Sequence, residues 1–411
     1  MSEAWIIDAC RSPRGIGKQG KGALAGMHPQ HVAASVLKAI ASRNQLDTAE
    51  VDDIIWGTSA QVGAQSGDLA RMAALDAGYD LRASGVTLDR FCGSGITSVN
   101  LAAGMVMSGM EDLLIAGGTE MMSMPARRLG DGPPMMDSGN LRLRDSHPQS
   151  HQGVCADAIA TMEKISRQAL DALAVESQQR AAVAIDKGYF QRSLVPVYRE
   201  DGSLALDKEE FPRPGTTLES LASLKPAFAA MADAPLDDRG TTYRHLILKK
   251  YPGLDIEFVH HAGNSSGVVD GAAALLIASA SYARKRGLKP RAKIIAMANL
   301  GDCPTLMLNA PVPAAQKVLQ KAGLSVKDID LWEINEAFAV VAEKFIRDLS
   351  LDRDKVNVNG GAMALGHPIG ATGSILIGTL LDELERRDAR YGLATMCAAG
   401  GMAPAIIIER G

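Results

Sequence analysis

Cys92 has the setting of a catalytic nucleophile. It lies within residues 89–97, where a strand-like run over 85–88 ends and a helical pattern begins. A cysteine just before a helix N-terminus has a geometry like that of a nucleophile elbow, and the helix dipole and free backbone N–H groups there favour the thiolate. Gly93 and Gly95 permit close approach of a substrate. The alternative is a buried structural cysteine beside a tight turn.

His367 is a candidate general base. It lies among the glycines of residues 359–373, just before a second helical pattern. A histidine with a pKa near neutrality can take a proton from a nucleophile. The glycines do not predict a nucleotide loop, because neither GxGxxG nor GKS/GKT is present. A lone histidine is more often structural, but the dense glycine setting favours catalysis.

Two further side chains could complete a site. Cys397 opens a Cys-Ala-Ala-Gly-Gly turn at the predicted end of the last buried strand, where packing alone is the alternative explanation. Asn335 follows a short apolar run at a predicted strand end. Its amide could position a water or an oxyanion, or it could cap a helix.

Together these motifs resemble the thiolase family from one end of the chain to the other. The family has a Cys-x-Ser-Gly turn, an Asn-Glu-Ala-Phe motif, a Gly-His-Pro-x-Gly motif and a second cysteine before a glycine-rich turn. The matching positions are residues 92–95, 335–338, 366–370 and Cys397. Residues 263–267 and 270–273 also match a family stretch.

The resemblance implies ping-pong acyl transfer. Cys92 would attack the ketone carbon of a 3-ketoacyl-CoA and become acylated, while His367 takes the thiol proton. Cys397 would act as acid or base on the α-carbon of acetyl-CoA. The reaction would yield acetyl-CoA and a shortened acyl-CoA, or in reverse condense two acetyl-CoA to acetoacetyl-CoA. Coenzyme A is then a substrate, and neither a metal nor a redox cofactor is expected.

The same resemblance implies two oxyanion holes and a pantetheine site. His367 and a water held by Asn335 would form one hole, and the backbone N–H groups of Cys92 and Ala399 the other. The family more often has glycine at the Ala399 position, but alanine keeps the N–H group. The expected contacts of coenzyme A are His151, Ala262, Ser266, Met307 and Phe338.

The elements that must hold these residues alternate along the chain. Strands are predicted at residues 5–9, 53–57 and 112–118, and helices at 31–41 and 94–109. Continuous apolar strands separated by helices predict a parallel sheet that is covered on both faces.

The pattern then recurs in the same order. Residues 46–56 resemble 324–332, and residues 113–118 resemble 395–401. Convergence of common α/β patterns is one explanation, but two matches in the same order favour a duplicated domain. The resemblance implies an α/β fold in which two βαβαβαββ halves form a five-layered α/β/α/β/α sandwich with an inserted loop domain.

The region between the halves has a different composition. Residues 122–264 are rich in Pro, Asp, Arg and Ser, with helices predicted at 156–164 and 171–187. Ligands of open α/β sheets bind beyond the carboxyl ends of strands, so this insertion predicts a lid that covers coenzyme A and the substrate. The predicted division is a first half at 1–121 and 265–290, the insertion at 122–264, and a second half at 291–411.

Bulk properties restrict the partners. With 411 residues and a net charge of −4, the chain predicts more than one domain and no electrostatic footprint for nucleic acid. No apolar run is expected to span a membrane, and no signal peptide or metal-binding pattern is evident. The 5 widely spaced cysteines favour reduced thiols and the cytoplasm. The family resemblance implies a homodimer or a dimer of dimers.

Several questions stay open at the level of the sequence. A 3-ketoacyl-acyl carrier protein synthase and a non-catalytic thioester-binding relative are the alternatives, while a dehydrogenase is excluded by the missing dinucleotide fingerprint. The acyl group could be short, long, aromatic-derived or steroid-derived. The segment before His151 looks shorter than in tetrameric family members, and residues 228–259 look longer than usual.

Overall fold

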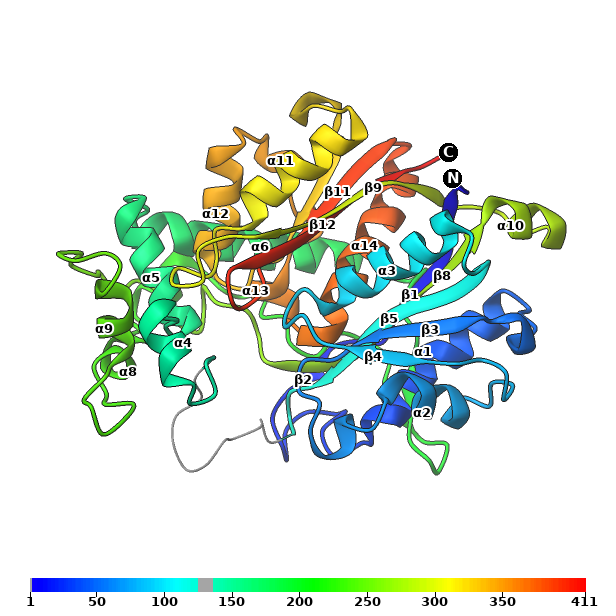
Figure 1. Ribbon diagram of the computed structural model, residues 1–411, viewed down its shortest axis with the longest axis horizontal. Helices are drawn as coiled ribbons and strands as arrows, with labels where there is room; N and C mark the ends of the chain where they lie inside the picture. The colour runs from blue at the N-terminus through cyan, green and yellow to red at the C-terminus, as the bar shows by residue number, and fades with distance from the viewer. Residues whose placement is uncertain (1, 125–135) are drawn as a thin grey trace.

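The computed structural model describes residues 2–124 and 136–411 (Figure 1). The part of the shortened segment before His151 that falls at 125–135 lies outside the described residues. In the described chain one large sheet has the strand order β10-β11-β12-β9-β1-β8-β5-β3-β4. Its strands are β1 (Ala4–Arg11), β3 (Asp53–Gly57), β4 (Val86–Leu88), β5 (Leu113–Met121), β8 (Val269–Ser279), β9 (Ala292–Gly301), β10 (Leu331–Ile334), β11 (Tyr391–Thr395) and β12 (Met402–Glu409), with β2 (Gly15–Ile16) paired to β8.

The prediction of a parallel sheet was wrong. β3 pairs in parallel with β4 and β5, and β10 with β11, but β8 and β12 run antiparallel to both of their neighbours. Strands β8 and β12 are almost fully buried, so their apolar runs do not distinguish the two directions. The two halves of the sheet join through the pairs Trp5–Lys293 and Ile6–Ala292 of β1 and β9.

The layers follow from which side chains share a core. Helices α1 (Pro29–Arg43) and α2 (Leu69–Asp76) cover one face of the first half, and α11 (Pro311–Ala322) and α12 (Ala339–Asp348) cover the second half. Between the halves lie α3 (Ser94–Ser108) and α14 (Ile369–Arg387), whose apolar side chains share one cluster with strands of both halves. The order is therefore α/β/α/β/α, as the resemblance implied, and Figure 1 shows α3 and α14 at the centre.

The two central helices touch backbone to backbone. A Cβ atom on Gly95 would lie 2.8 Å from the backbone nitrogen of Gly373, and Ser374 Oγ donates to the Gly95 carbonyl over 3.1 Å. Only glycine permits this approach. Because α3 follows Cys92 and α14 follows His367, the contact brings the two motifs to the same end of the central layer.

Helix α3 also passes a composition test for membrane spans. Among the described residues, 91–108 is the one stretch long and apolar enough, which the sequence reading did not anticipate, and 67% of it is buried inside the fold. A central-layer helix is apolar on all sides because it packs against both sheet halves.

Most helices of the insertion form a group at the left of Figure 1. Helices α5 (Gln152–Met162) and α6 (Arg167–Asp186) agree with the two predicted helices. Around them lie α4 (Leu141–Ser146), α7 (Leu218–Ala222), α8 (Ala229–Ala232) and α9 (Tyr243–Leu248). The hairpin of β6 (Val197–Tyr198) and β7 (Leu204–Leu206) packs instead on the first half, where Val197 and Leu206 share a core with α1. The remaining α-helices of the described residues are α10 (Ala280–Arg286) and α13 (Ala362–Leu365).

Candidate active site

The turn that carries Cys92 is tightly constrained. Phe91 adopts a left-handed conformation with φ 49°, which is unusual for a residue with a side chain. Asp89 accepts the Phe91 N–H over 2.6 Å, and Ser94 Oγ accepts the Arg90 N–H over 2.8 Å. The turn thus resembles the predicted elbow, and it holds the Cys92 side chain at 5% exposure.

The helix N-terminus favours the Cys92 thiolate, but the surroundings of the sulfur as a whole oppose it. Burial raises the pKa of its thiol, and the nearby Cys397 and Glu120 raise it further. Desolvation outweighs the helix N-terminus because the thiol is almost wholly removed from water. Cys92 therefore needs a base that takes its proton as it attacks.

His367 is held as a neutral base. Thr372 Oγ1 lies 2.6 Å from His367 Nδ1 and donates its own hydrogen to the Pro368 carbonyl over 3.0 Å. Nδ1 must therefore carry the ring hydrogen, which leaves the lone pair on Nε2. Burial lowers the pKa of His367 to about 4, so the expectation of a pKa near neutrality was wrong. Burial disfavours the charged imidazolium in the resting site.

Asn335 and Cys397 lie at the ends of two neighbouring parallel strands. Asn335 follows β10 and donates its N–H to the Thr395 carbonyl of β11 over 3.3 Å. Its amide nitrogen is 3.4 Å from His367 Nε2, and its Oδ1 is buried without a partner among the described residues. The helix-cap alternative was wrong, because the N-cap of α12 is Phe338.

Cys397 precedes the last strand rather than ending it. It follows β11, and the turn that begins with Cys397 returns the chain into β12 through Gly400 and Gly401, both with φ 78°. Burial raises the pKa of the Cys397 thiol to about 12. A Cβ atom on Gly93 would lie 3.4 Å from Ala398 Cβ, so the turns that carry the two cysteines face each other.

Two backbone N–H groups in these turns are free to bind an anion. Among the described residues, neither the Cys92 nor the Ala399 N–H group donates to a carbonyl or carboxylate oxygen. Both residues are buried, at 5% and 2% exposure. Unpaired buried N–H groups are rare and indicate a site that an oxyanion can satisfy.

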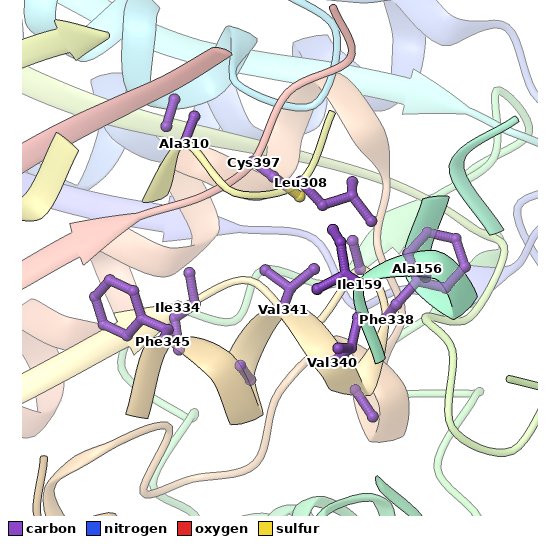
Figure 2. Close-up of a cluster of buried hydrophobic side chains, with 14 of the residues drawn as sticks. Ala156, Ile159, Leu308, Ala310, Ile334, Phe338, Val340, Val341, Phe345 and Cys397 are labelled. Atoms are coloured by element: carbon purple, nitrogen blue, oxygen red, sulfur yellow. The ribbon is translucent and has the colours of Figure 1, made fainter. Parts of the chain in front are cut away.

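The expected coenzyme A contacts fall into two places. Ser266, Met307 and Phe338 lie near the motifs: the Ser266 N–H donates to the Ala337 carbonyl over 3.0 Å, and Figure 2 shows Phe338 in the same buried cluster as Cys397. Met307 belongs to that cluster and has φ 65°. The fifth contact, Ala262, is exposed and lines a surface pocket of about 360 Å³ with Gly263, Met363 and Arg213.

His151 joins the cluster through aromatic rings. Its ring lies 5.6 Å from Phe228 and 5.4 Å from Tyr243, and the Phe228 ring lies 5.8 Å from Phe338. Phe228 and Tyr243 both belong to the segment 228–259 that looked longer than usual. This segment therefore contributes directly to the wall beside Phe338.

Sequence reasoning missed two buried residues around the motifs. One is Thr372, whose place five residues after His367 in the same glycine-rich motif was an available signal. The other is Glu120, a lone carboxylate in the apolar strand β5. It accepts the N–H groups of Ser59, Ala60 and Gly370 over 2.8 to 3.0 Å and so ties β5 to the first turn of α14.

Thr372→Val should lower kcat about fivefold with a smaller change in KM. The valine keeps the volume but cannot accept the Nδ1 hydrogen, and one such hydrogen bond contributes about 1 kcal/mol to holding the base. Steady-state kinetics of the Val and Ser variants provide the test. Thr372→Ser retains the hydroxyl and should stay near wild type; an equal loss in both would assign the effect to methyl packing instead.

The comparisons with known proteins agree with this geometry. Residues 4–233 match the model "Thiolase, N-terminal domain" and residues 288–410 match "Thiolase, C-terminal domain". The chain is 39% identical to a 3-ketoacyl-CoA thiolase of Serratia proteamaculans, with 100% of both chains covered. It is 40% identical to a beta-ketoadipyl-CoA thiolase of Escherichia coli, again with 100% of both covered.

Solved structures give the same result. The acetyl-CoA acetyltransferase of Bacillus anthracis is 34% identical with a TM-score of 0.85, covering 100% of this chain and 99% of that one. The human mitochondrial 3-ketoacyl-CoA thiolase in complex with CoA is 34% identical with a TM-score of 0.84, covering 100% and 98%. Full-length matches to thiolases at this identity exclude the synthase alternative. The chain belongs to the thiolase family and is an acyltransferase.

Proposed function

We propose that this thiolase acts through Cys92, His367, Cys397 and Asn335. The assignment rests on two pairs of residues that lie close together at one end of the central layer. The Cys92 and Cys397 turns face each other, and the Asn335 amide lies 3.4 Å from His367 Nε2. The proposed chemistry uses two thiols, a histidine, a water held by Asn335 and two backbone N–H groups, and it assigns no step to a metal.

In the cleavage direction Cys92 Sγ attacks the ketone carbon of a 3-ketoacyl-CoA. Its proton passes to His367 Nε2, the nitrogen that the Thr372 contact leaves unprotonated. The bond between the ketone carbon and the α-carbon then breaks, which leaves the acyl group on Cys92 and an enolate of acetyl-CoA. A thioester suits this step because a thiolate is both a good nucleophile and a good leaving group.

The enolate and the tetrahedral oxyanion need preorganised donors. The imidazolium of His367 and a water bound by Asn335 would stabilise the enolate oxygen, and the free N–H groups of Cys92 and Ala399 would stabilise the oxyanion on the acyl carbon. Cys397 then donates its thiol proton to the α-carbon. Its pKa of about 12 keeps that proton available at neutral pH. Free coenzyme A finally gives its thiol proton to the Cys397 thiolate and attacks the acyl carbon. The bond to Cys92 then breaks, and the leaving Cys92 thiolate takes back its proton from His367.

Coenzyme A would enter past the pocket that Ala262 lines. Its wall includes Arg213, whose guanidinium lies 5.3 Å from the Phe211 ring and can pair with phosphate. The solved human relative is a complex with CoA. The neutral pantetheine arm would then run towards Ser266 and the apolar ring of Phe338.

A homodimer, singly or as a dimer of dimers, is the proposed assembly. Strand β4 forms an edge of the sheet, and its Val86 is 44% exposed, while Leu101 of the adjoining α3 is 49% exposed. An edge strand with exposed apolar neighbours is a template for a second copy. The proposed location is the cytoplasm, in keeping with 5 free cysteines.

Thiolysis of acetoacetyl-CoA beside a longer-chain 3-ketoacyl-CoA tests the function and the acyl class. The loss of 3-ketoacyl absorbance reports each reaction, and we expect activity on at least one substrate. The ratio of the two kcat/KM values separates a short-chain enzyme from a broad one. If folded protein cleaves neither substrate, the result would favour the non-catalytic alternative or a bulky substrate. A steroid acyl group is one example, since a relative from Mycobacterium tuberculosis that is 38% identical is named a steroid 3-ketoacyl-CoA thiolase.

A further inference from the structure

Glu336 is a buried carboxylate that follows Asn335 directly in the chain. It lies between the end of β10 and the N-cap of α12, at 2% exposure. The amide of its neighbour Asn335 is the group that lies 3.4 Å from His367 Nε2. A carboxylate enclosed in this way is strongly destabilising unless hydrogen-bond donors surround it. The donors that Glu336 has found therefore determine how it can act.

Three donors meet the Glu336 carboxylate, and they come from three separate segments. Asn357 Nδ2 donates to Oε1 over 3.0 Å. Ser177 Oγ of α6 donates to Oε2 over 2.7 Å, and the Met363 N–H of α13 donates to the same oxygen over 3.1 Å. The carboxylate therefore joins the insertion, the loop between α12 and α13, and the segment that leads to His367.

Asn357 also holds the chain on the other side of Asn335. Its Oδ1 accepts the Ile334 N–H over 2.9 Å, and its Nδ2 donates to the Ile334 carbonyl over 2.8 Å. The N–H of Asn357 itself donates to the Trp332 carbonyl over 2.9 Å. The residue before Asn335 and the residue after it are thus bound by one side-chain amide, which leaves the Asn335 backbone little freedom to move.

The segment that precedes His367 is held by the same carboxylate. Ser177 Oγ, which donates to Glu336, accepts the Gly361 N–H over 2.9 Å. A Cβ atom on Gly361 would lie 2.2 Å from the carboxyl carbon of Glu336, so only glycine lets the chain pass this close. Gly361 is the N-cap of α13, and His367 comes one glycine after the end of that helix. Glu336 therefore also binds the segment that carries the base.

We propose that Glu336 is a positioning residue for the acyl-transfer reaction. It sets the separation of the Asn335 amide and His367 Nε2, and with it the place of the water and the imidazolium that would stabilise the enolate oxygen. This inference rests on the function proposed above for Asn335 and His367. Glu336 acts through these two groups and is assigned no contact with the substrate. Misplacing a reacting group by about 1 Å from a distance can lower a rate about a hundredfold, so such an anchor has a large effect.

An ionised carboxylate suits these partners because it only accepts hydrogen bonds. Glu336→Gln keeps the shape but replaces one oxygen with an NH2 group. In one orientation that group faces the Met363 N–H, and in the other it faces Asn357 Nδ2. The Asn357 amide cannot turn over to accept from it, because its oxygen and its nitrogen both bind Ile334. The substitution therefore breaks at least one link without leaving a cavity.

The test is a double-mutant cycle of Glu336→Gln and Asn335→Ala in the full-length enzyme, measured as rates of thiolysis. We expect Glu336→Gln alone to lower kcat between about tenfold and a hundredfold, with KM for coenzyme A within about twofold of the wild type. In the Asn335→Ala background the same change should lower kcat no more than about threefold, because the amide that it positions is gone. Losses that multiply in full, or an unchanged kcat in Glu336→Gln, would overturn the proposal. If Asn335→Ala alone left turnover unchanged, the role of Asn335 in the proposed function would fail first, and this inference with it.

Glu343→Gln separates positioning from a loss of stability. Glu343 is a carboxylate of α12 that is equally buried, at 2% exposure, but it pairs with the partly exposed arginines Arg347 and Arg353. This variant should keep kcat near that of the wild type even if its melting temperature falls. A loss of kcat as large as that of Glu336→Gln would assign both effects to stability and would contradict the positioning role.

Ser177→Ala is a milder variant of the same network. It keeps the Glu336 carboxylate and removes only the hydroxyl that links it to Gly361, so kcat should fall by a smaller factor than in Glu336→Gln. If Glu336→Gln does not fold, Ser177→Ala takes its place in the cycle with Asn335→Ala. Its loss of kcat should then shrink in the Asn335→Ala background, and a loss of the same size in both backgrounds would overturn the proposal.

Discussion

Cys92→Ala should abolish thiolysis, with a loss of roughly 10⁴-fold or more, the scale seen when a covalent nucleophile is removed. Cys92 is the sulfur at the constrained turn before α3, beside two free N–H groups that can hold the oxyanion. An alanine there still allows the substrate to bind, but it has no atom that can accept the acyl group. Initial rates of 3-ketoacyl-CoA cleavage measure the loss. Intact-protein mass spectrometry should show that the acyl adduct of the wild type is missing from the variant.

Cys10→Ala is the matched control for this experiment. Cys10 is also buried and free, but its Sγ donates to the Val36 carbonyl beneath α1. This variant should lose some stability and keep its turnover and its acyl adduct. If Cys92→Ala retained full activity, the nucleophile would have to be another group, and the roles given to His367 and Cys397 would change with it.

His367→Asn should slow acylation of Cys92 by roughly 10²- to 10⁴-fold, the range typical of a lost general base. The resting thiol of Cys92 is protonated because burial raises its pKa, so attack requires a proton acceptor. Asparagine can fill the volume and form hydrogen bonds but cannot take the proton. Single-turnover formation of the acyl-enzyme isolates this step. His245→Asn on the exposed face of α9 is the control, and it should leave the rate of acylation unchanged.

The pH profile of the wild type tests the same base. Burial lowers the pKa of His367 to about 4, so the free imidazole is available above that pH and is lost as pH falls through it. The acid limb of kcat/KM, which reports the free enzyme, should therefore lie below pH 5. A limb near the ordinary histidine value of about 6.5 would mean that His367 is more solvated or paired with an anion.

Local pattern was enough to predict many elements. Strand β3 occupies the predicted residues 53–57, and α3 and α5 begin within a few residues of the predicted positions. The internal repeat is also present. Short 3₁₀ turns at Thr48–Glu50 and Val326–Asp328 precede β3 and β10 in the two halves, which explains why residues 46–56 and 324–332 look alike. These features depend on residues close together in the chain.

The motif residues were predictable as well, because glycines and reactive side chains at fixed spacing identify the turns. What the motifs could not give was the partner of each side chain. Thr372 fixes the tautomer of His367, and Glu120 anchors the first turn of α14, although neither carried a signal strong enough to be named in advance. The prediction of strand direction failed for a similar reason, because β8 and β12 are apolar throughout but pair antiparallel with their neighbours.

By itself the sequence determined the family, the duplicated α/β plan and the cysteines, histidine and asparagine at the strand ends and helix starts. Tertiary structure alone decided their ionisation. Cys92, Cys397 and His367 are each at most 5% exposed, and that burial makes the thiols acids that must be deprotonated and the imidazole a neutral base. The physical reason is desolvation, which depends on how completely distant segments enclose a group and not on the residues beside it in the chain.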